Sequence, residues 1–317
     1  MTALLLPIAG LFSLIVWMRR RLYRRGVLRT FHVGVPVVVV GNITAGGSGK
    51  TPLTIWLVSH LQARGLRPGV VSRGYAGAVQ GCAEVRADSA ATEVGDEPLL
   101  IHVKTGAPVV VGRDRVAAAR MLLARHPGVD VVVSDDGLQH YRLHRTLEIA
   151  VLDAATGLGN GWPLPAGPLR EPPGRLHSVD VVVQSVRGDV QPRALAGLAS
   201  WPVAFSAGRV WRLANPAETR SLSDLPPRDW LAIAGIGQPQ GYFDMLTRAG
   251  LHFTPRVYAD HHAYRLEELP ADRAVLMTEK DAVKCQGFAA PDWWVLALDA
   301  TPHADFVAWL DKRLALL

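Results

Sequence analysis

Residues 35–51 read VPVVVVGNITAGGSGKT, a run of branched apolar residues followed by a glycine-rich turn and a lysine–threonine pair. A continuous run of valines is typical of a strand that is buried on both faces of a parallel sheet. The residues that follow, 51–64, have the apolar periodicity of a helix. The order of strand, glycine-rich loop and helix is the context in which a phosphate-binding loop works, and it predicts an α/β fold.

The glycine-rich loop is expected to bind the phosphates of ATP. Its glycines allow several backbone N–H groups to point inward, and the helix N-terminus adds partial positive charge. We expect Lys50 to reach the β and γ phosphates and Thr51 to ligate Mg²⁺. The usual first glycine of the motif falls on Thr44, and a glycine turn without ligand is the alternative. The predicted nucleotide site comprises Thr44, Gly46, Gly47, Ser48, Gly49, Lys50 and Thr51.

A second predicted strand ends in two carboxylates. Residues 131–136 read VVVSDD, so the acidic pair follows a buried apolar run. Open α/β sheets bind ligands at the carboxyl ends of their strands, where this pair would lie. We expect Asp135 to hold Mg²⁺, directly or through water, with Asp136 in support. A helix cap or a turn is the alternative interpretation, because Asp favours both.

The rest of the chain alternates between strand and helix patterns, which is typical of a mostly parallel sheet covered by helices. Five prolines between residues 192 and 227 predict a linker with some extended structure. Further strands are predicted at 69–72, 108–111, 129–134, 147–153, 179–185, 230–234, 253–258, 274–278 and 293–298, with helices at 116–125 and after 240. We therefore expect a P-loop NTPase-like three-layer α/β/α domain over 26–200, a linker over 201–228, and a second, smaller α/β/α domain over 229–317.

The charge of the chain is distributed unevenly. The formal net charge is +6, yet ten basic residues and no acidic one precede Glu84. This local basic front does not favour a general nucleic-acid binder, whose basic surface is spread over a fold. A hydrophobic content of 49% excludes disorder as the main state. Cys82 and Cys285 are too few for a disulfide framework and lack metal-site spacing, which fits a reducing compartment.

The N-terminus is predicted to bind a membrane. Residues 2–18 carry no charged side chain, and six arginines follow within 11 residues. A helix of this length spans about 25 Å against a hydrocarbon core of about 30 Å, which favours a shallow anchor. The arginines would face anionic headgroups on the cytoplasmic side. Because they follow the apolar run, a signal peptide is not indicated. We expect 1–25 to be a membrane-anchoring helix, with a buried core helix as the alternative.

Eight short motifs follow one another along the chain. They are GNITAGGSGKTP (41–52), SRGY (72–75), GDEP (95–98), GRDR (112–115), DDGLQH (135–140), PAGPLREP (165–172), DHHAY (260–264) and MTEKDAVK (277–284). This ordered set resembles the tetraacyldisaccharide 4'-kinase family, the lipid A kinases of Gram-negative bacteria, over nearly the whole chain. The resemblance implies two α/β/α domains with the active site between them. It also implies transfer of the ATP γ-phosphate to the 4'-hydroxyl of a tetraacylated disaccharide 1-phosphate, at the cytoplasmic face of the inner membrane.

The resemblance also implies roles for individual residues. Asp96 matches the catalytic carboxylate of the family and His261 its histidine partner, while Asp135 matches the metal-binding aspartate. Arg170 and Glu171 match an Arg–Glu pair near the nucleotide and the metal. A helix cap is the alternative for Asp96, and a metal site is the alternative for the two histidines of DHHAY.

Three further residues are predicted to lie near the substrate. Arg113 and Arg115 could supply positive charge around the transferring phosphoryl group, which such reactions require. Tyr75 is the third candidate, on the side of the lipid substrate. The expected partners are therefore ATP, Mg²⁺, the acylated disaccharide phosphate and an anionic membrane surface, with no nucleic acid and no prediction of oligomeric state.

A P-loop ATPase switch at the membrane surface, without lipid phosphorylation, is the competing function. The loop of such switches has a lysine where this chain has Ala45, which counts against it. Guanine specificity needs N/T-K-x-D, and Thr278–Asp281 has its lysine one place too late.

Overall fold

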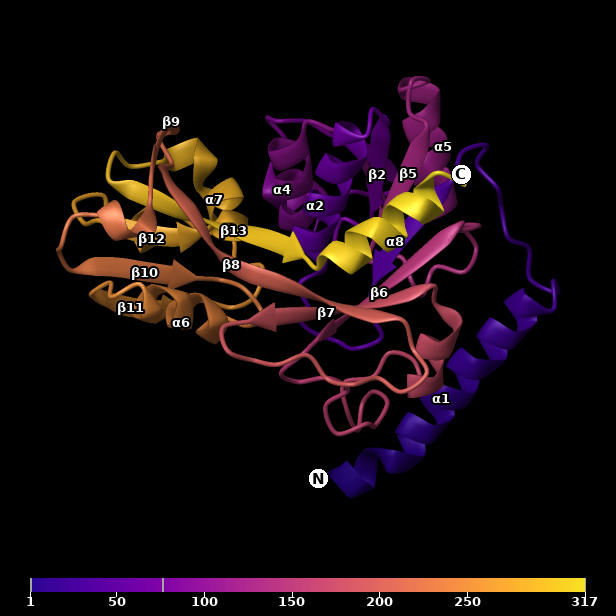
Figure 1. The fold of residues 1–317 in the computed structure, drawn as a ribbon. Helices are drawn as coiled ribbons and strands as arrows, with labels where there is room; N and C mark the ends of the chain where they lie inside the picture. Colours follow the sequence, from indigo (N-terminus) through magenta and orange to yellow (C-terminus); the bar gives the residue numbers. More distant parts are fainter. Residues whose placement is uncertain (1, 76, 317) are drawn as a thin grey trace.

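The polypeptide folds around one long mixed sheet (Figure 1). The computed structural model describes residues 2–75 and 77–316. The strands of the first half are β1 (Val37–Gly41), β2 (Pro68–Ser72), β3 (Cys82–Val85), β4 (Val109–Gly112), β5 (Val131–Asp135), β6 (Leu147–Asp153) and β7 (Val181–Arg187). Its helices are α1 (Thr2–Arg24), α2 (Lys50–Ala63), α3 (Ala91–Val94), α4 (Asp96–Thr105), α5 (Arg115–Arg125) and η1 (Pro173–Ser178).

The second half continues the same sheet. Its strands are β8 (Ser200–Arg212), β9 (Asn215–Arg220), β10 (Trp230–Ala234), β11 (Phe253–Val257), β12 (Val275–Thr278) and β13 (Trp293–Pro302). Its helices are α6 (Gln240–Arg248), α7 (Glu279–Cys285), α8 (Ala304–Leu314) and the short turns η2 (Leu222–Asp224), η3 (Leu266–Glu268) and η4 (Gln286–Phe288). The strand order is β11-β10-β12-β13-β8-β7-β6-β1-β5-β2-β4-β3, with β9 paired to β8. The α/β fold expected from the sequence is confirmed.

Strand β1 lies inside the first half, between β5 and β6, and is parallel to both. Its valines alternate between the two faces of the sheet. Val38 and Val40 join the core that contains α2, whereas Val37 and Val39 join the core on the opposite face with residues of α5. All four are buried. This is the arrangement that an uninterrupted apolar run predicts for a central strand.

The two halves meet at β8. This strand begins parallel to β7 and continues antiparallel to β13, so one strand joins both parts of the sheet. The stretch 201–228, expected as a linker, thus contains most of β8 and all of β9. The division of the chain into 26–200 and 229–317 stays a prediction.

The C-terminal helix α8 returns to the first half (Figure 1). Phe306 and Leu310 are buried in the same apolar core as residues of α2. His60 of α2 lies 2.8 Å from Asp311 of α8, which also pairs with Arg64. A helix from the end of the chain therefore covers the face of the sheet that carries α2.

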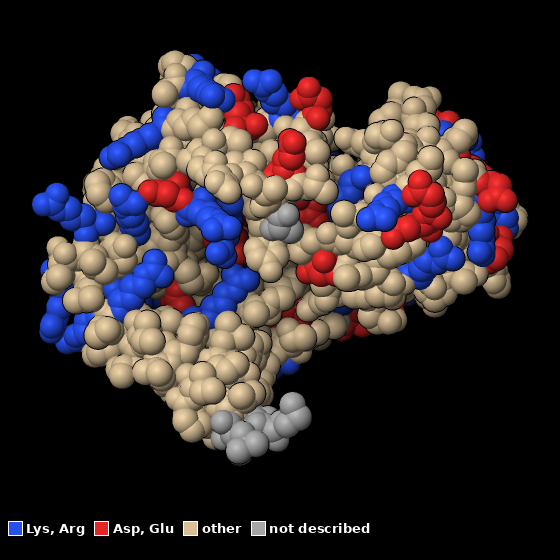
Figure 2. Space-filling view, turned by 180° about the vertical axis from the view of Figure 1, so that it is seen from behind, with Lys and Arg blue, Asp and Glu red and all other residues tan. Residues whose placement is uncertain are grey.

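Helix α1 extends away from the sheet along one side of the molecule (Figure 1). It continues past the apolar run and includes most of the following arginines. The large apolar side chains that it exposes are Ile8, Leu11, Leu14, Ile15, Trp17 and Met18. Figure 2 shows a surface without charged side chains at the lower end of that view, with basic side chains beside it. Among the described residues, no helix has both the length and the apolar character needed to cross a bilayer.

Candidate active site

The glycine-rich loop between β1 and α2 is braced from inside. The side-chain amide of Asn42 donates hydrogen bonds to the hydroxyls of Ser48, at 3.0 Å, and Thr44, at 3.3 Å. Thr44 also pairs with Leu169 in an isolated β-bridge. The residue that replaces the usual first glycine therefore holds the loop against the segment of the PAGPLREP motif. Gly49 ends the loop with a φ of 86° and caps α2.

Lys50 and Thr51 begin α2, are buried, and line a cavity at the centre of the molecule. The ammonium of Lys50 lies 3.7 Å from a carboxylate oxygen of Asp136. Arg170 approaches the same carboxylate to 2.9 Å, and it lines the cavity as well. Asp136 thus balances two cations beside the loop. Its carboxylate and the Thr51 hydroxyl are oxygen donors of the kind that Mg²⁺ prefers.

Asp135 lies deeper than Asp136. Its two carboxylate oxygens accept hydrogen bonds from the hydroxyls of Thr54 and Ser72, each at 3.1 Å. It is 1% exposed. The pKa of Asp135 is raised to about 6. Burial is the largest cause, and the nearby negative charge of Glu97 is the second largest. The DDGLQH motif begins with two aspartates. Of these two, Asp136 is among the described residues that line the cavity and Asp135 is not.

Asp96 and His261 form a hydrogen-bonded pair across the two halves. His261 Nδ1 lies 2.9 Å from both carboxylate oxygens of Asp96. The hydrogen bonds that the His261 imidazole donates to Asp96 raise the pKa of that imidazole, although its burial lowers the pKa. The same carboxylate accepts the Glu97 backbone N–H at 2.8 Å, but the N-cap of α4 is Gly95 and no side chain caps this helix, so the helix-cap alternative for Asp96 is not supported. The two motifs that contribute these residues therefore meet, although 165 positions separate them.

The backbone around this pair is tightly constrained. Gly95 has a φ of 92°, and a Cβ there would approach the carbonyl oxygen of Tyr75 to 2.8 Å. This close approach explains why glycine precedes Asp96. The Tyr75 ring lies 5.2 Å from the His261 ring, centroid to centroid. Tyr75 is 61% exposed, so it borders the pair on the side of solvent.

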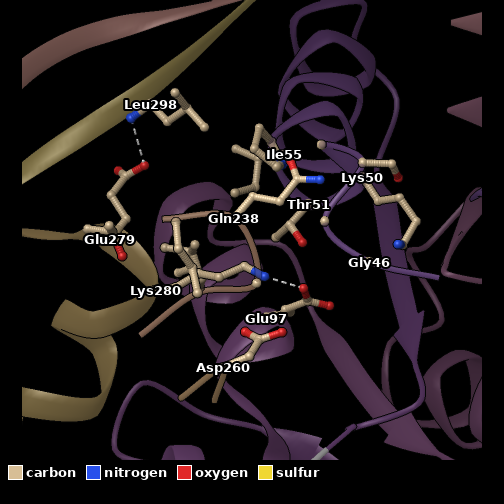
Figure 3. A pocket seen from close by; sticks show the side chains of 18 of the residues that line it. Gly46, Lys50, Thr51, Ile55, Glu97, Gln238, Asp260, Glu279, Lys280 and Leu298 are labelled. Carbon is tan, nitrogen blue, oxygen red and sulfur yellow. Dashed lines mark hydrogen bonds and ion pairs between the residues drawn. The ribbon is translucent and has the colours of Figure 1, made fainter. Parts of the chain in front are cut away.

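These groups surround one cavity of about 420 Å³. Residues from both halves of the sheet line it (Figure 3). The first half contributes Gly46, Gly47, Ser48, Gly49, Lys50, Thr51, Arg73, Tyr75, Glu97, Asp136 and Arg170, and the second half contributes Gln238, Asp260, His261 and Lys280. The cavity therefore brings the phosphate loop and the histidine of the Asp–His pair to one place.

Sequence reasoning missed an ion pair in this cavity. Glu97 of α4 pairs with Lys280 of α7, and both side chains line the cavity (Figure 3). Burial raises the pKa of Glu97, but Lys280 outweighs it and lowers that pKa to about 2. Both residues lie within quoted motifs, GDEP and MTEKDAVK. Their separation of 183 positions carries no spacing signal that could have paired them.

Six predicted site residues are not among the described residues that line the cavity: Thr44, Asp96 and Asp135, whose positions are given above, and Glu171, Arg115 and Arg113. Glu171 is 1% exposed and accepts a hydrogen bond from the Tyr141 hydroxyl at 2.7 Å, while Arg175 lies 3.2 Å away. Arg115 is buried and donates to the Gly112 carbonyl at 3.0 Å. Arg113 is exposed. None of Glu171, Arg115 and Arg113 is among the described residues that line the cavity.

The second histidine of DHHAY has a different environment. His262 Nε2 lies 2.9 Å from Glu268, and its ring stacks on Tyr258 with 4.8 Å between centroids. In the part of the chain that the structure describes, no group of three His, Cys, Asp or Glu residues could hold a metal ion. This geometry gives the histidine metal site no support.

Comparison with known proteins gives one consistent family. The family model described as tetraacyldisaccharide-1-P 4'-kinase matches residues 1–315. A tetraacyldisaccharide 4'-kinase of Thiobacillus denitrificans is 62% identical over 99% of this chain and 95% of that protein. A tetraacyldisaccharide 4'-kinase of Azoarcus sp. is 49% identical over 94% of this chain and 87% of that protein.

The fold has a solved counterpart. The crystal structure of LpxK from Aquifex aeolicus, described as a complex with ATP, matches with a TM-score of 0.86 at 27% identity. The match covers 99% of this chain and 98% of that chain. The similarity therefore extends over both halves of the sheet and is not confined to the phosphate loop.

Proposed function

This chain belongs to the tetraacyldisaccharide-1-P 4'-kinase family, and from that membership we propose which of its residues carry out phosphoryl transfer. The protein is an ATP-dependent kinase that phosphorylates the 4'-hydroxyl of a tetraacyldisaccharide 1-phosphate in lipid A biosynthesis. The observation that carries the assignment of residues is the Asp96–His261 pair, whose histidine lines the same cavity as the phosphate loop.

In this proposal Asp96 accepts the proton of the 4'-hydroxyl as that oxygen attacks the γ-phosphorus. A carboxylate in this role contributes typically 10²–10⁴-fold to the rate. His261 keeps the carboxylate oriented through its Nδ1 hydrogen bonds. Asp96 is 4% exposed, so the hydroxyl must enter the cavity beside His261 to reach it. Tyr75, on the solvent side of His261, is proposed to contact the sugar.

ATP would bind with its phosphates in the loop from Thr44 to Thr51, held by backbone N–H groups and Lys50. Mg²⁺ would be held by the Thr51 hydroxyl and Asp136, with Asp135 behind them. A Mg²⁺ ion held by these residues would supply positive charge that offsets the negative charge of the transferring phosphoryl group. Arg170 is proposed to balance the charge of Asp136, which it already contacts at 2.9 Å.

The remaining predicted residues are proposed to act indirectly. Glu171 contacts Tyr141 and Arg175 and would support Arg170 from behind. Arg115 would support Asp135, because it donates to that residue's backbone carbonyl at 3.4 Å. Arg113 is exposed, and its role as a source of positive charge around the transferring phosphoryl group stays a prediction.

Helix α1 is proposed to place the enzyme on the cytoplasmic face of the bacterial inner membrane. Its exposed apolar residues, such as Leu11 and Trp17, suit shallow insertion between lipids. The arginines of its last turns are near the level of anionic headgroups in that pose. The acylated substrate is then presented at the surface where the enzyme is held.

The product of the reaction separates this function from that of an ATPase switch. The full-length protein is incubated with γ-labelled ATP and Mg²⁺, with and without the acylated disaccharide 1-phosphate. We expect the label to appear on the lipid as a second phosphate monoester, in proportion to added lipid. Release of labelled inorganic phosphate with no labelled lipid would support the switch and refute the assignment.

A further inference from the structure

The chain is poor in lysine. Of its 34 basic residues, 29 are arginines and five are lysines. Three of those five, Lys50, Lys104 and Lys280, line the central cavity. An ammonium differs from a guanidinium in being a compact point charge on a flexible stem. Arg73, Arg170 and Arg187 line the cavity as well, so three of the five lysines but only three of the 29 arginines are found there among the described residues.

The three lysines have different partners. Lys50 belongs to the phosphate loop. Lys104 lies 2.6 Å from Glu279, which also accepts the Leu298 backbone N–H at 3.0 Å and so ties α4 to β13. Lys280 alone has its partner in the GDEP motif that carries the catalytic carboxylate. Lys280 therefore contacts the segment that carries the proposed base, whereas Lys104 only joins α4 to the second half.

The surroundings of Lys280 are strongly acidic. Burial lowers the pKa of its ammonium, but Glu97, Asp96 and Asp260 together raise that pKa above its ordinary value. Its charge in turn opposes protonation of His261. The ammonium thus lies close enough to the Asp96–His261 pair to influence it.

Lys280 and Lys50 approach the same space from opposite walls. Lys280 extends from α7 of the second half, and its ammonium meets Glu97 beside Thr51 (Figure 3). Lys50 also lowers the pKa of Glu97 by its charge, so both ammonium groups act on one carboxylate. A phosphoryl group between the loop and Asp96 would present further negative oxygens to both cations. Phosphoryl transfer is accelerated mainly by such placed positive charge.

We propose that Lys280 is a catalytic residue, whose ammonium binds the transferring phosphoryl group from the wall opposite Lys50, and that Glu97 positions it. This inference rests on the assignment of Asp96 as the base. The proposed transfer needs no reactant other than ATP and the lipid. The oxygen of the 4'-hydroxyl bonds to phosphorus, the bond to the ADP oxygen breaks, and the hydroxyl proton passes to Asp96. Lys280 remains protonated throughout and stabilises charge on the phosphoryl oxygens.

The test compares full-length Lys280→Met with a charge-neutral pair, Glu97→Gln/Lys280→Met. Loss of one donor to a transition state typically lowers kcat by about 100-fold or more. We expect that loss in Lys280→Met, with KM for ATP changed by less than about threefold because the loop still binds the phosphates. The double variant should be equally slow, since the missing ammonium is what limits it. Lys312→Met, on the exposed face of α8, is the matched control and should keep the wild-type rate.

Other results of these measurements would overturn the catalytic role of Lys280. If Lys280 serves only as a partner for Glu97, the double variant should regain nearly the wild-type kcat, and the inference is overturned. The double variant also decides the matter should Lys280→Met alone fail to fold. Asp96→Asn is measured in parallel. Wild-type turnover of Lys280→Met beside a slow Asp96→Asn refutes Lys280 alone, whereas wild-type turnover of both refutes the proposed base as well.

Discussion

His261 Nδ1 lies 2.9 Å from each carboxylate oxygen of Asp96, although the two residues come from opposite halves of the sheet. His261 adopts a left-handed backbone conformation with a φ of 60°, which is uncommon for a residue other than glycine. Such backbone is retained where the surrounding structure enforces it. The pair thus depends on how β8 and β13 hold the halves together.

The first prediction concerns the proposed base. Asp96→Asn keeps the shape of the side chain but removes its ability to accept a proton, so kcat should fall by about 10²–10⁴-fold. Affinity for ATP should change little, because the loop from Thr44 to Thr51 is untouched. Single-turnover kinetics and equilibrium binding of ATP measure the two effects separately. Asp305→Asn, at an exposed position on α8, serves as the control. A collapse of ATP affinity with persistent turnover of bound ATP would show that Asp96 is not the base.

The second prediction concerns pH. Asp96 raises the pKa of His261 above its ordinary value of 6.5. The pair's contribution to the free energy of unfolding should therefore be complete below about pH 6.5 and be lost as pH rises through the raised pKa. His261→Asn tolerates the left-handed backbone but cannot be protonated. Urea unfolding of both proteins between pH 5.5 and 9 should show a stability difference that shrinks with rising pH.

The exposed His252 provides a matched comparison for this measurement. His252→Asn should leave the pH dependence of unfolding unchanged. A difference between wild type and His261→Asn that grew with pH would contradict the prediction, because the sign of the linkage is fixed by the raised pKa.

The third prediction separates two glycines of the phosphate loop. A Cβ at Gly49 would lie 2.7 Å from the ring of Phe205, and the φ of 86° disfavours any larger residue. A Cβ at Gly47 meets only Gln238, at 3.9 Å. Gly49→Ala should lower the apparent free energy of unfolding by about 2–4 kcal/mol and weaken ATP binding. Gly47→Ala should change it by less than about 1 kcal/mol. Similar unfolding midpoints for both variants would contradict this account.

The fourth prediction concerns the buried charges behind the loop. Arg175 is 1% exposed and pairs with Glu148 at 2.5 Å and Glu171 at 3.2 Å. Arg175→Met would leave Glu171 buried without a cation, at a cost of about 3–5 kcal/mol. Chemical denaturation should reveal this loss. Arg67→Met removes a pair with the partly exposed Asp130 and should cost less than about 1 kcal/mol. Equal losses of unfolding free energy in the two variants would mean that burial does not determine how much each ion pair contributes to stability.

The fifth prediction concerns membrane binding. Arg19, Arg21 and Arg24 are exposed on α1, and each basic residue near an anionic surface contributes about 1 kcal/mol. Replacing all three by Gln should weaken binding to phosphatidylglycerol-containing vesicles by about 100-fold at low salt. Sedimentation with the vesicles measures this affinity.

Two controls accompany the membrane experiment. The triple Gln variant at Arg209, Arg248 and Arg256, exposed elsewhere, should bind as the wild type does. Deleting residues 1–18 should abolish partition even with the arginines present, because the apolar anchor is gone. Unchanged partition after that deletion would refute the role of α1.

Local signals in the sequence predicted most of the elements. The valine run of β1 and the glycine loop were recognisable because a buried strand and a phosphate loop each leave a short, contiguous pattern. The strand predicted at 147–153 matches β6 in both bounds, and that at 230–234 matches β10. Strand β8 was not foreseen, because Pro202 lies within it and further prolines lie on both sides of it, which indicated a linker with some extended structure. Propensity therefore indicated a linker where pairing with β7 and β13 makes a strand.

The site residues also fall into two groups, those that local sequence patterns indicated and those that they did not. Lys50, Thr51, Asp135 and Asp136 could be chosen from the residues alone, since each stands at the end of a recognisable strand or loop. Asp96 and His261 were paired only through the resemblance of their motifs to a family. Lys280 and Glu97 were not paired at all, because an ion pair between distant positions leaves no periodicity or spacing in either segment.

By itself, the sequence determined the class of fold, the phosphate loop, the apolar N-terminal segment with the arginines that follow it and, through its ordered motifs, the family. These properties depend on neighbouring residues and survive without knowledge of long-range contacts. Only the tertiary structure decided that β8 joins both halves into one sheet, that α8 packs on α2, and that Glu97 meets Lys280 beside the Asp96–His261 pair. Each of these is a contact between segments far apart in the chain, and such contacts are set by packing of the whole core.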